Sequence, residues 1–178
     1  MIAKTLLLLA GLLSACVAPM SHTPDSVFYS IHAGSVLTLH RPLGIPPEQV
    51  SVYFQHGELR NEALLDRYLP HCKFEIRTMA QTPRRVQPGR FIISRVVDET
   101  EATTALSGVY WASLQLAGGP PSVYNYVTQL YLTSAQQSDV LRLSCMHWED
   151  VLDDNYLTVP QMREALGDWF SLTLKPAM

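Results

Sequence analysis

The stretch "CKFEIRT", residues 72–78, carries the clearest strand pattern in the chain. Its apolar and charged side chains alternate and would lie on opposite faces of a strand: Cys72, Phe74 and Ile76 against Lys73, Glu75 and Arg77. This alternation is typical of an antiparallel sheet with one face on the core and the other in water. We therefore predict a β-rich domain around this strand.

Segments of similar character lie on both sides of this stretch, separated by Gly, Pro and Asn. We predict strands on either side of Ala33-Gly34 and at residues 51–57, 90–97, 109–116, 123–133, 139–148 and 170–174. A turn at residues 82–89 predicts a hairpin between the strands at 72–78 and 90–97. Residues 98–108 are predicted to form a polar loop, and one or two helical turns are predicted after Asn61 as N-cap.

One longer helix is predicted near the C-terminus. Thr158 and Gln161 have capping-box spacing, and Pro160 falls in the first turn, where its missing N–H is tolerated. Gly167 stands where a C-terminal cap is expected. Helix and strands together predict a mainly β fold, an antiparallel β-sandwich or curled sheet with one C-terminal α-helix, forming a single domain over residues 27–178.

The N-terminal residues have the build of a secretory signal peptide. Lys4 precedes an uncharged apolar segment at residues 6–13, about half of the ~20 residues that a membrane-spanning helix needs. The sequence Leu13-Ser14-Ala15-Cys16 follows and resembles the lipobox of bacterial lipoproteins. The resemblance implies cleavage of residues 1–15 and attachment of lipid, including palmitate, to Cys16. An ordinary secretory peptide is the alternative.

The same resemblance implies a location in the cell envelope. Val17 rather than an aspartate follows the cysteine, which in enterobacterial sorting favours the outer membrane, with the protein on its periplasmic face. Residues 16–26 hold prolines and serines without periodicity, as in a flexible tether. The central and C-terminal region is similar to uncharacterised lipoproteins of Gram-negative bacteria, which implies a compartment but no activity.

Three cysteines are present. With Cys16 assigned to lipid, Cys72 and Cys145 remain, and both lie on the apolar phase of their strands. In an oxidising periplasm this predicts a disulfide, which would stabilise the fold by roughly 4 kcal/mol on the chain-entropy model. The alternative is a copper or zinc site that uses Cys72, Cys145 and His147, since thiolate and imidazole suit these metals.

Five arginines fall close together in a chain that is otherwise net negative, with 13 Lys and Arg against 16 Asp and Glu. The predicted hairpin would gather them at one end: Arg77, Arg84, Arg85, Arg90 and Arg95. Guanidinium groups suit phosphates and carboxylates, so these residues are candidates for binding an anionic envelope component such as lipid A or peptidoglycan. The alternative is a solvated hairpin tip.

No motif in the sequence points to catalysis. A G-x-S-x-G elbow is absent, so no enzyme activity and no cofactor are expected, although a cell-wall hydrolase that uses His71 or His147 stays an alternative. The acidic group around Asp153 lacks EF-hand spacing. The acidic balance argues against nucleic acid. We therefore expect a non-catalytic, lipid-anchored module whose partners are the membrane and an envelope protein or anionic component.

Overall fold

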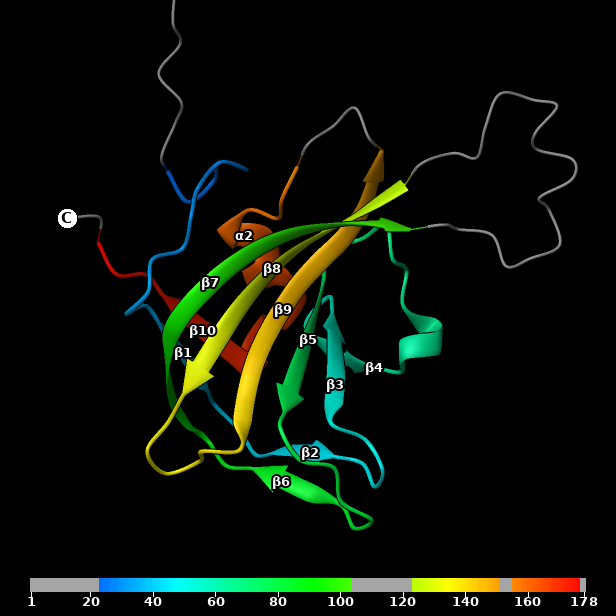
Figure 1. Cartoon of the computed structure of the whole chain (residues 1–178), viewed down its shortest axis with the longest axis vertical. Coiled ribbons are helices and arrows are strands. Elements are labelled where there is room, and N and C mark those ends of the chain that lie inside the picture. Colours follow the sequence, from blue (N-terminus) through cyan, green and yellow to red (C-terminus); the bar gives the residue numbers. More distant parts are fainter. Residues whose placement is uncertain (1–22, 104–122, 151–154, 177–178) are drawn as a thin grey trace, which may run out of the picture.

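The computed structural model describes residues 23–103, 123–150 and 155–176. The chain forms one eight-stranded sheet in the order β10-β1-β7-β8-β9-β5-β3-β4, with every neighbouring pair antiparallel, and a separate two-stranded sheet of β2 and β6 (Figure 1). The strands of the large sheet are β1 Val36–Leu39, β3 Ser51–Gln55, β4 Glu58–Arg60, β5 His71–Ile76, β7 Gly89–Thr103, β8 Val123–Thr133, β9 Val140–Asp150 and β10 Phe170–Thr173; the small sheet holds β2 Leu43–Ile45 and β6 Arg84–Val86. The predicted mainly β class with one C-terminal α-helix is confirmed.

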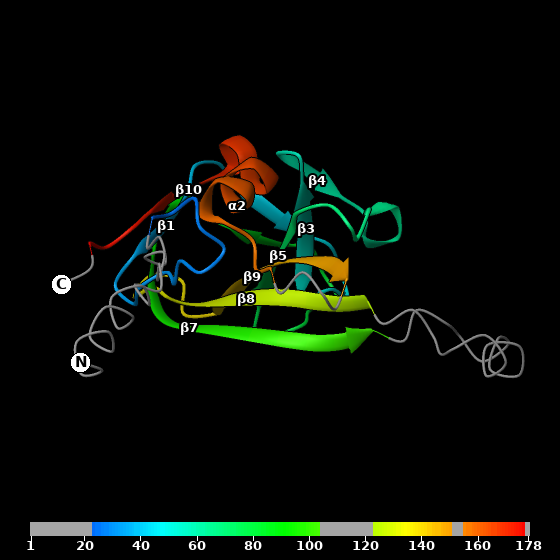
Figure 2. The same cartoon turned by 90° about the horizontal axis from the view of Figure 1, so that it is seen from above.

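Helix α2, Val159–Leu166, lies on the concave side of the curled sheet (Figure 2). The side chain of Thr158 accepts a hydrogen bond from the Gln161 N–H, and the Gln161 side chain accepts one from the Thr158 N–H, so the predicted capping box is present. The apolar side of the helix packs towards β10, which follows it in the chain, and towards β3 and β5, which are distant in sequence. Its buried residues are Val159, Met162, Ala165 and Leu166.

Aromatic rings fill the space between sheet and helix. Phe74 on β5 stacks on Phe170 of β10 at 5.5 Å between ring centroids, and Phe54 on β3 meets Phe170 edge-on at 5.5 Å. Phe91 on β7 lies 6.1 Å from Phe74. The large sheet therefore curls around an apolar core, because strands from its two halves, β10 and β7 on one side and β5 and β3 on the other, contribute to the same ring cluster.

Two glycines bring the β3–β4 turn against the end of α2. Gly57 and Gly167 have φ angles of 75° and 52°, and the N–H of Gly57 donates to the carbonyl of Ala165 at 3.0 Å. A Cβ on Gly167 would lie 2.5 Å from the Gly57 Cα. Only glycine accommodates both the positive φ and this backbone approach.

Several local predictions are confirmed. The pattern at residues 72–78 forms β5, the segments at 123–133 and 139–148 form the β8–β9 hairpin, and residues 170–174 supply β10. The short helix after Asn61 is the 3₁₀-helix η1, Glu62–Leu64, whose N-cap side chain accepts from the Ala63 N–H.

Other predictions are wrong. Residues 26–33 form no strand; the N–H of Gly34 instead donates to the carbonyl of Ile93. Residues 98–103, predicted as loop, continue β7 because they pair with β8 as far as Thr103 and Val123. The segments that form β2, β4 and β6 were not predicted as strands. The strand predicted at 109–116 lies outside the described residues.

The predicted hairpin between β5 and β7 does not form. Strands β8 and β9 lie between them in the sheet. The turn region 82–89 instead forms β6, which pairs with β2.

The last residues of the predicted tether contact the domain. The N–H of Ser26 donates to the carbonyl of Thr23 at 2.9 Å, which closes a turn, and the N–H of Val159 donates to the carbonyl of Pro24 at 3.1 Å. The described chain therefore starts beside the first turn of α2.

Candidate functional site

The predicted disulfide joins two neighbouring strands. Cys72 on β5 and Cys145 on β9 are directly opposite in register, with their Cα atoms 4.0 Å and their sulfur atoms 2.05 Å apart. Both residues are fully buried in the core. The pairing predicted from strand phase is thus confirmed, and no thiol of this pair is free to act as nucleophile or metal ligand.

The histidines next to the disulfide face backbone carbonyl groups. His147 Nε2 lies 2.8 Å from the Asn155 oxygen, and His71 Nδ1 lies 2.9 Å from the Leu69 oxygen. Burial lowers the pKa of His71, and the positive charge of Arg67 acts in the same direction. Within the described ranges, no three His, Cys, Asp or Glu side chains are arranged to hold a metal ion. A metal site at Cys72, Cys145 and His147 would require the disulfide to open.

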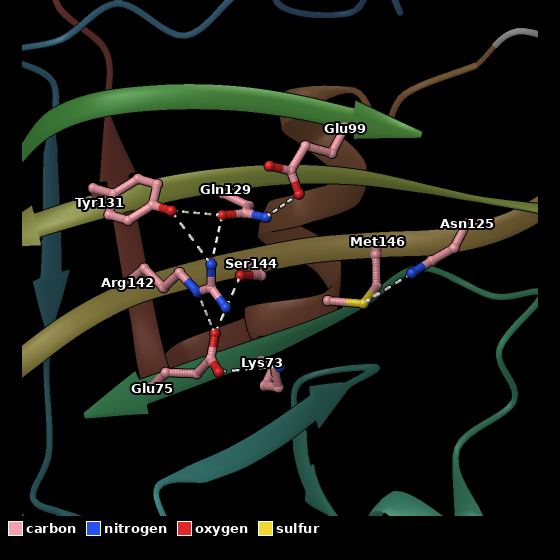
Figure 3. A network of polar contacts seen from close by, with 9 residues as sticks. All are labelled: Lys73, Glu75, Glu99, Asn125, Gln129, Tyr131, Arg142, Ser144 and Met146. Atoms are coloured by element: carbon pink, nitrogen blue, oxygen red, sulfur yellow. Dashed lines mark hydrogen bonds and ion pairs between the residues drawn. The ribbon is translucent and has the colours of Figure 1, made fainter. Parts of the chain in front are cut away.

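The outer face of the sheet carries a network of polar groups, some of them buried, across β5, β9, β8 and β7 (Figure 3). Arg142 Nε donates to Glu75 Oε2 at 2.5 Å, and Lys73 Nζ lies 3.1 Å from Glu75 Oε1. Arg142 Nη1 also donates to Gln129 Oε1 at 2.6 Å, and Gln129 Nε2 donates to Glu99 Oε2 at 2.6 Å. The neutral amide of Gln129 therefore links the Glu75–Arg142 ion pair to Glu99, and the network spans four strands.

The network controls the ionisation of its central carboxylate. Burial of Glu75 favours the neutral form, but the hydrogen bond from Arg142 and the charge of Lys73 outweigh it, so the pKa of Glu75 lies below its ordinary value. The hydrogen bond to Glu75 likewise raises the pKa of Arg142. Because these charges satisfy one another, the network stabilises a half-covered sheet face rather than offering a free acid or base.

The exposure predicted from the sequence for this face is wrong for Glu75. The alternation in residues 72–78 predicted that Lys73 and Glu75 would be in water, but Glu75 is only 8% exposed. Its partner Arg142 comes from β9, which is far away in sequence. The available signal was charge complementarity between residues of the same strand phase, namely Glu75 and Arg142.

The five arginines do not gather into one cluster, because the hairpin that would have brought them together does not form. Arg84 pairs with Asp139 at 2.8 Å, and Arg77 Nε donates to the Ser138 carbonyl in the same loop. The guanidinium of Arg95 lies 3.9 Å from the centre of the Tyr131 ring on the outer face. The other two, Arg85 on β6 and Arg90 on β7, are exposed.

The aromatic residues of β8 and β9 divide between the two faces of the sheet. Tyr126 is buried, while Tyr131 lies on the outer face. Trp148 packs edge-on against Tyr68 at 5.6 Å. Trp111 and Asp153 lie outside the described residues.

Two concavities of equal volume are candidates for a ligand; one lies beside Arg90 and Ile92, and the other lies at the β3 edge of the sheet. Its volume is about 580 Å³, and it is lined by the start of β3, the end of β4 and Met79. Smaller pockets of about 300 Å³ beside Tyr156 and about 270 Å³ beside Arg84 lie elsewhere. The groove is of the size of small-ligand sites in proteins, about 300–1,000 Å³.

These features define a disulfide-bonded, mainly β domain with a polar outer face and a groove at one sheet edge. No family model, curated protein or solved structure matches this chain in the comparisons with known proteins. In the part of the chain that the structure describes, no helix is long and apolar enough to cross a membrane.

Proposed function

We propose that the chain is a bacterial lipoprotein, attached through lipid on Cys16 to the periplasmic face of the outer membrane, whose β domain is a non-catalytic interaction module. The observation that carries this proposal is the sequence Leu13-Ser14-Ala15-Cys16 directly after the apolar segment at residues 6–13. An acyl anchor of more than one chain holds a protein stably at a membrane, at about 0.8 kcal/mol for each buried methylene.

Two features of the domain support the proposal. The Cys72–Cys145 disulfide leaves Cys16 as the one cysteine of the three without a cysteine partner, and disulfides persist in oxidising compartments such as the periplasm. The polar groups of the outer face pair with one another, which favours a structural or binding surface over an acid–base centre. The partner would be an envelope protein or an anionic envelope component.

The anchor is tested by labelling bacteria that produce the chain with radioactive palmitate. We expect label on the wild type and none on Cys16→Ala, with the variant also lost from the membrane fraction after high-salt washing. Asp25→Ala, which changes an exposed residue after the lipobox, serves as the matched control and should keep both label and location. Equal labelling of Cys16→Ala and wild type would overturn the proposal.

A second experiment tests the sorting step. Val17→Asp introduces the residue that favours retention at the inner membrane in enterobacteria, so the lipidated variant should move to the inner-membrane fraction. Val17→Ala is the control. If both variants fractionate with the outer membrane, this position does not sort the protein.

A further inference from the structure

One side of β3 is an open edge of the sheet. Strand β4 pairs with β3 only from Tyr53 to Gln55, and the chain then leaves the sheet at Asn61, the N-cap of η1. The carbonyl of Val50 accepts from the Ile76 N–H, so Val50 faces β5. Because successive residues of a strand direct their backbone groups to opposite sides, the N–H and C=O of Ser51 face the open side.

The groove of about 580 Å³ continues the line of β4 along this edge. Its lining includes residues 49–52 and two exposed apolar residues, Leu59 at 41% and Met79 at 63% exposed. An unpaired strand edge next to apolar side chains is the geometry by which proteins bind extended peptides, since the edge supplies backbone hydrogen bonds and the side chains supply pockets.

The polar side of the groove is acidic. Glu48 and Glu62 both line it. Glu62 also pairs with Arg67 at 3.4 Å, and the cation in the lining, Arg60, pairs with Glu58 at 2.7 Å, so Glu48 is the carboxylate of the lining without an ion pair among the described residues. Burial and the neighbouring charge of Glu62 raise the pKa of Tyr53 to about 12, so this phenol stays a neutral donor towards the carboxylate. An acidic lining selects a basic ligand.

Glu48 has an unusual backbone conformation at the mouth of the groove. Its φ angle is 59°, which is uncommon for a residue other than glycine, and its N–H donates to the carbonyl of Ala80 at 2.8 Å. This hydrogen bond holds the turn before β3 against the segment after Met79, so the two walls of the groove are fixed relative to one another.

We propose that this groove binds an extended peptide segment of a partner protein that carries a basic side chain. The segment adds as a short strand beside Ser51, exchanges backbone hydrogen bonds with it, and places its basic group near Glu48 and Glu62. Its apolar side chains, alternate to the basic one, contact Leu59 and Met79. This inference rests on the proposed role of the domain as an interaction module and names the chemistry of its partner.

The test uses the full-length chain in detergent and a blocked pentapeptide of alternating threonine and valine with a central lysine. We expect saturable binding by fluorescence anisotropy and, by NMR hydrogen exchange, slower exchange of the Ser51 amide when the peptide is bound. A peptide with glutamate in place of lysine should bind about tenfold more weakly, since its charge is repelled by the groove.

Variants of the groove separate the contribution of the strand edge to peptide binding from that of the acidic side chains. Ser51→Pro removes the donor on the open edge without removing a bond to β5, and it should abolish binding. Glu48→Gln and Glu62→Gln should reduce the preference for lysine over glutamate while keeping the fold, whether or not the proline variant folds. Glu164→Gln, an exposed carboxylate on α2, is the matched control and should bind as the wild type does.

Equal binding of the lysine and glutamate peptides, or protection of other amides without that of Ser51, would overturn the inference. So would self-association of the chain through this edge in place of peptide binding. Peptide binding needs no acyl chain, so Cys16→Ala should bind the peptide as the wild type does. A result that contradicts the lipid anchor can therefore be told apart from a result that contradicts peptide binding in the groove.

Discussion

Each face of the sheet has residues that are almost completely buried, but different interactions stabilise the two faces. On β5, Phe74 is fully buried on the inner face, and its neighbour Glu75, on the outer face, is 8% exposed. Phe74 packs against the rings of Phe91 and Phe170, whereas Glu75 is held by Arg142 and Lys73. The inner face depends on shape and volume, and the outer face depends on the presence of every charged partner.

This difference determines how each face responds to change. Removal of apolar volume from the inner face loses transfer free energy and leaves a cavity, at any pH. Removal of one group from the outer face leaves its partner buried without a counter-charge, and the size of the effect depends on pH and salt. Substitutions on neighbouring residues of one strand can therefore separate the two kinds of stabilisation.

The largest effect is expected from Phe74→Ala. The substitution removes a ring from the centre of the aromatic cluster, and we expect the free energy of unfolding in urea to fall by about 3–5 kcal/mol. Lys73→Ala, at the preceding residue on the outer face, should cost less than this, because Glu75 keeps Arg142 as its counter-charge when Lys73 is removed. Similar losses of unfolding free energy for the two variants would show that the two faces do not respond differently to the loss of one side chain.

The second largest effect is expected from removal of the disulfide, which lies on the inner face. Because Cys72 and Cys145 are 73 residues apart in sequence, the bond restricts the unfolded chain, and Cys72→Ala with Cys145→Ala should cost about 2–4 kcal/mol. Thermal unfolding with and without a reducing agent checks this. The reductant should lower the melting temperature of the wild type and leave that of the double variant unchanged; a wild type insensitive to it despite full reduction contradicts the prediction.

The elements that the sequence predicted are those whose signals are local. The alternation in residues 72–78, the capping box at Thr158 and the apolar phase shared by Cys72 and Cys145 each depend on neighbours in the chain. These signals predicted β5, α2 and, through an assumed pairing of strands, the disulfide. They are reliable where local propensity and tertiary packing favour the same structure.

The features that were missed depend on distant residues. Residues 98–103 are polar and were predicted as loop, but pairing with β8, such as Glu99 opposite Val127, supplies the hydrogen bonds of a strand. The order of the sheet places β8 and β9 between β5 and β7, which no local pattern encodes. Burial of Glu75 and dispersal of the arginines both follow from that order, so the candidate site could be predicted only in part.

A smaller, pH-dependent effect is expected for Glu75→Gln. Loss of the carboxylate leaves the guanidinium of Arg142 half-buried without its counter-charge, and we expect a loss of about 1–3 kcal/mol near neutral pH. Because the pKa of Glu75 is lower in the folded state than its ordinary value of 4.5, its contribution is present above that value. It is lost as the pH falls through the lower pKa of the folded protein.

Urea unfolding at several pH values between about 6 and 3 measures this contribution. The difference between wild type and Glu75→Gln should shrink as the pH falls, because acid neutralises the carboxylate in the wild type as well. Glu58→Gln, which removes an exposed carboxylate paired with Arg60, serves as control and should show a small difference. A difference for Glu75→Gln that stays constant with pH would show that packing, and not charge, stabilises the outer face.

The smallest effect is expected at the margin of the outer network. The guanidinium of Arg95 stacks on the ring of Tyr131, and an exposed cation–π contact contributes about 0.5–1 kcal/mol, so Arg95→Ala should lower the free energy of unfolding by that amount. Arg85→Ala is the matched control, since this exposed arginine lies on β6 outside the large sheet and should change stability by less than about 0.5 kcal/mol. In the background of Tyr131→Leu the effect of Arg95→Ala should disappear, because the ring that attracts the cation is gone. If the effect persists there, Arg95 stabilises the outer face through its aliphatic stem rather than through its charge.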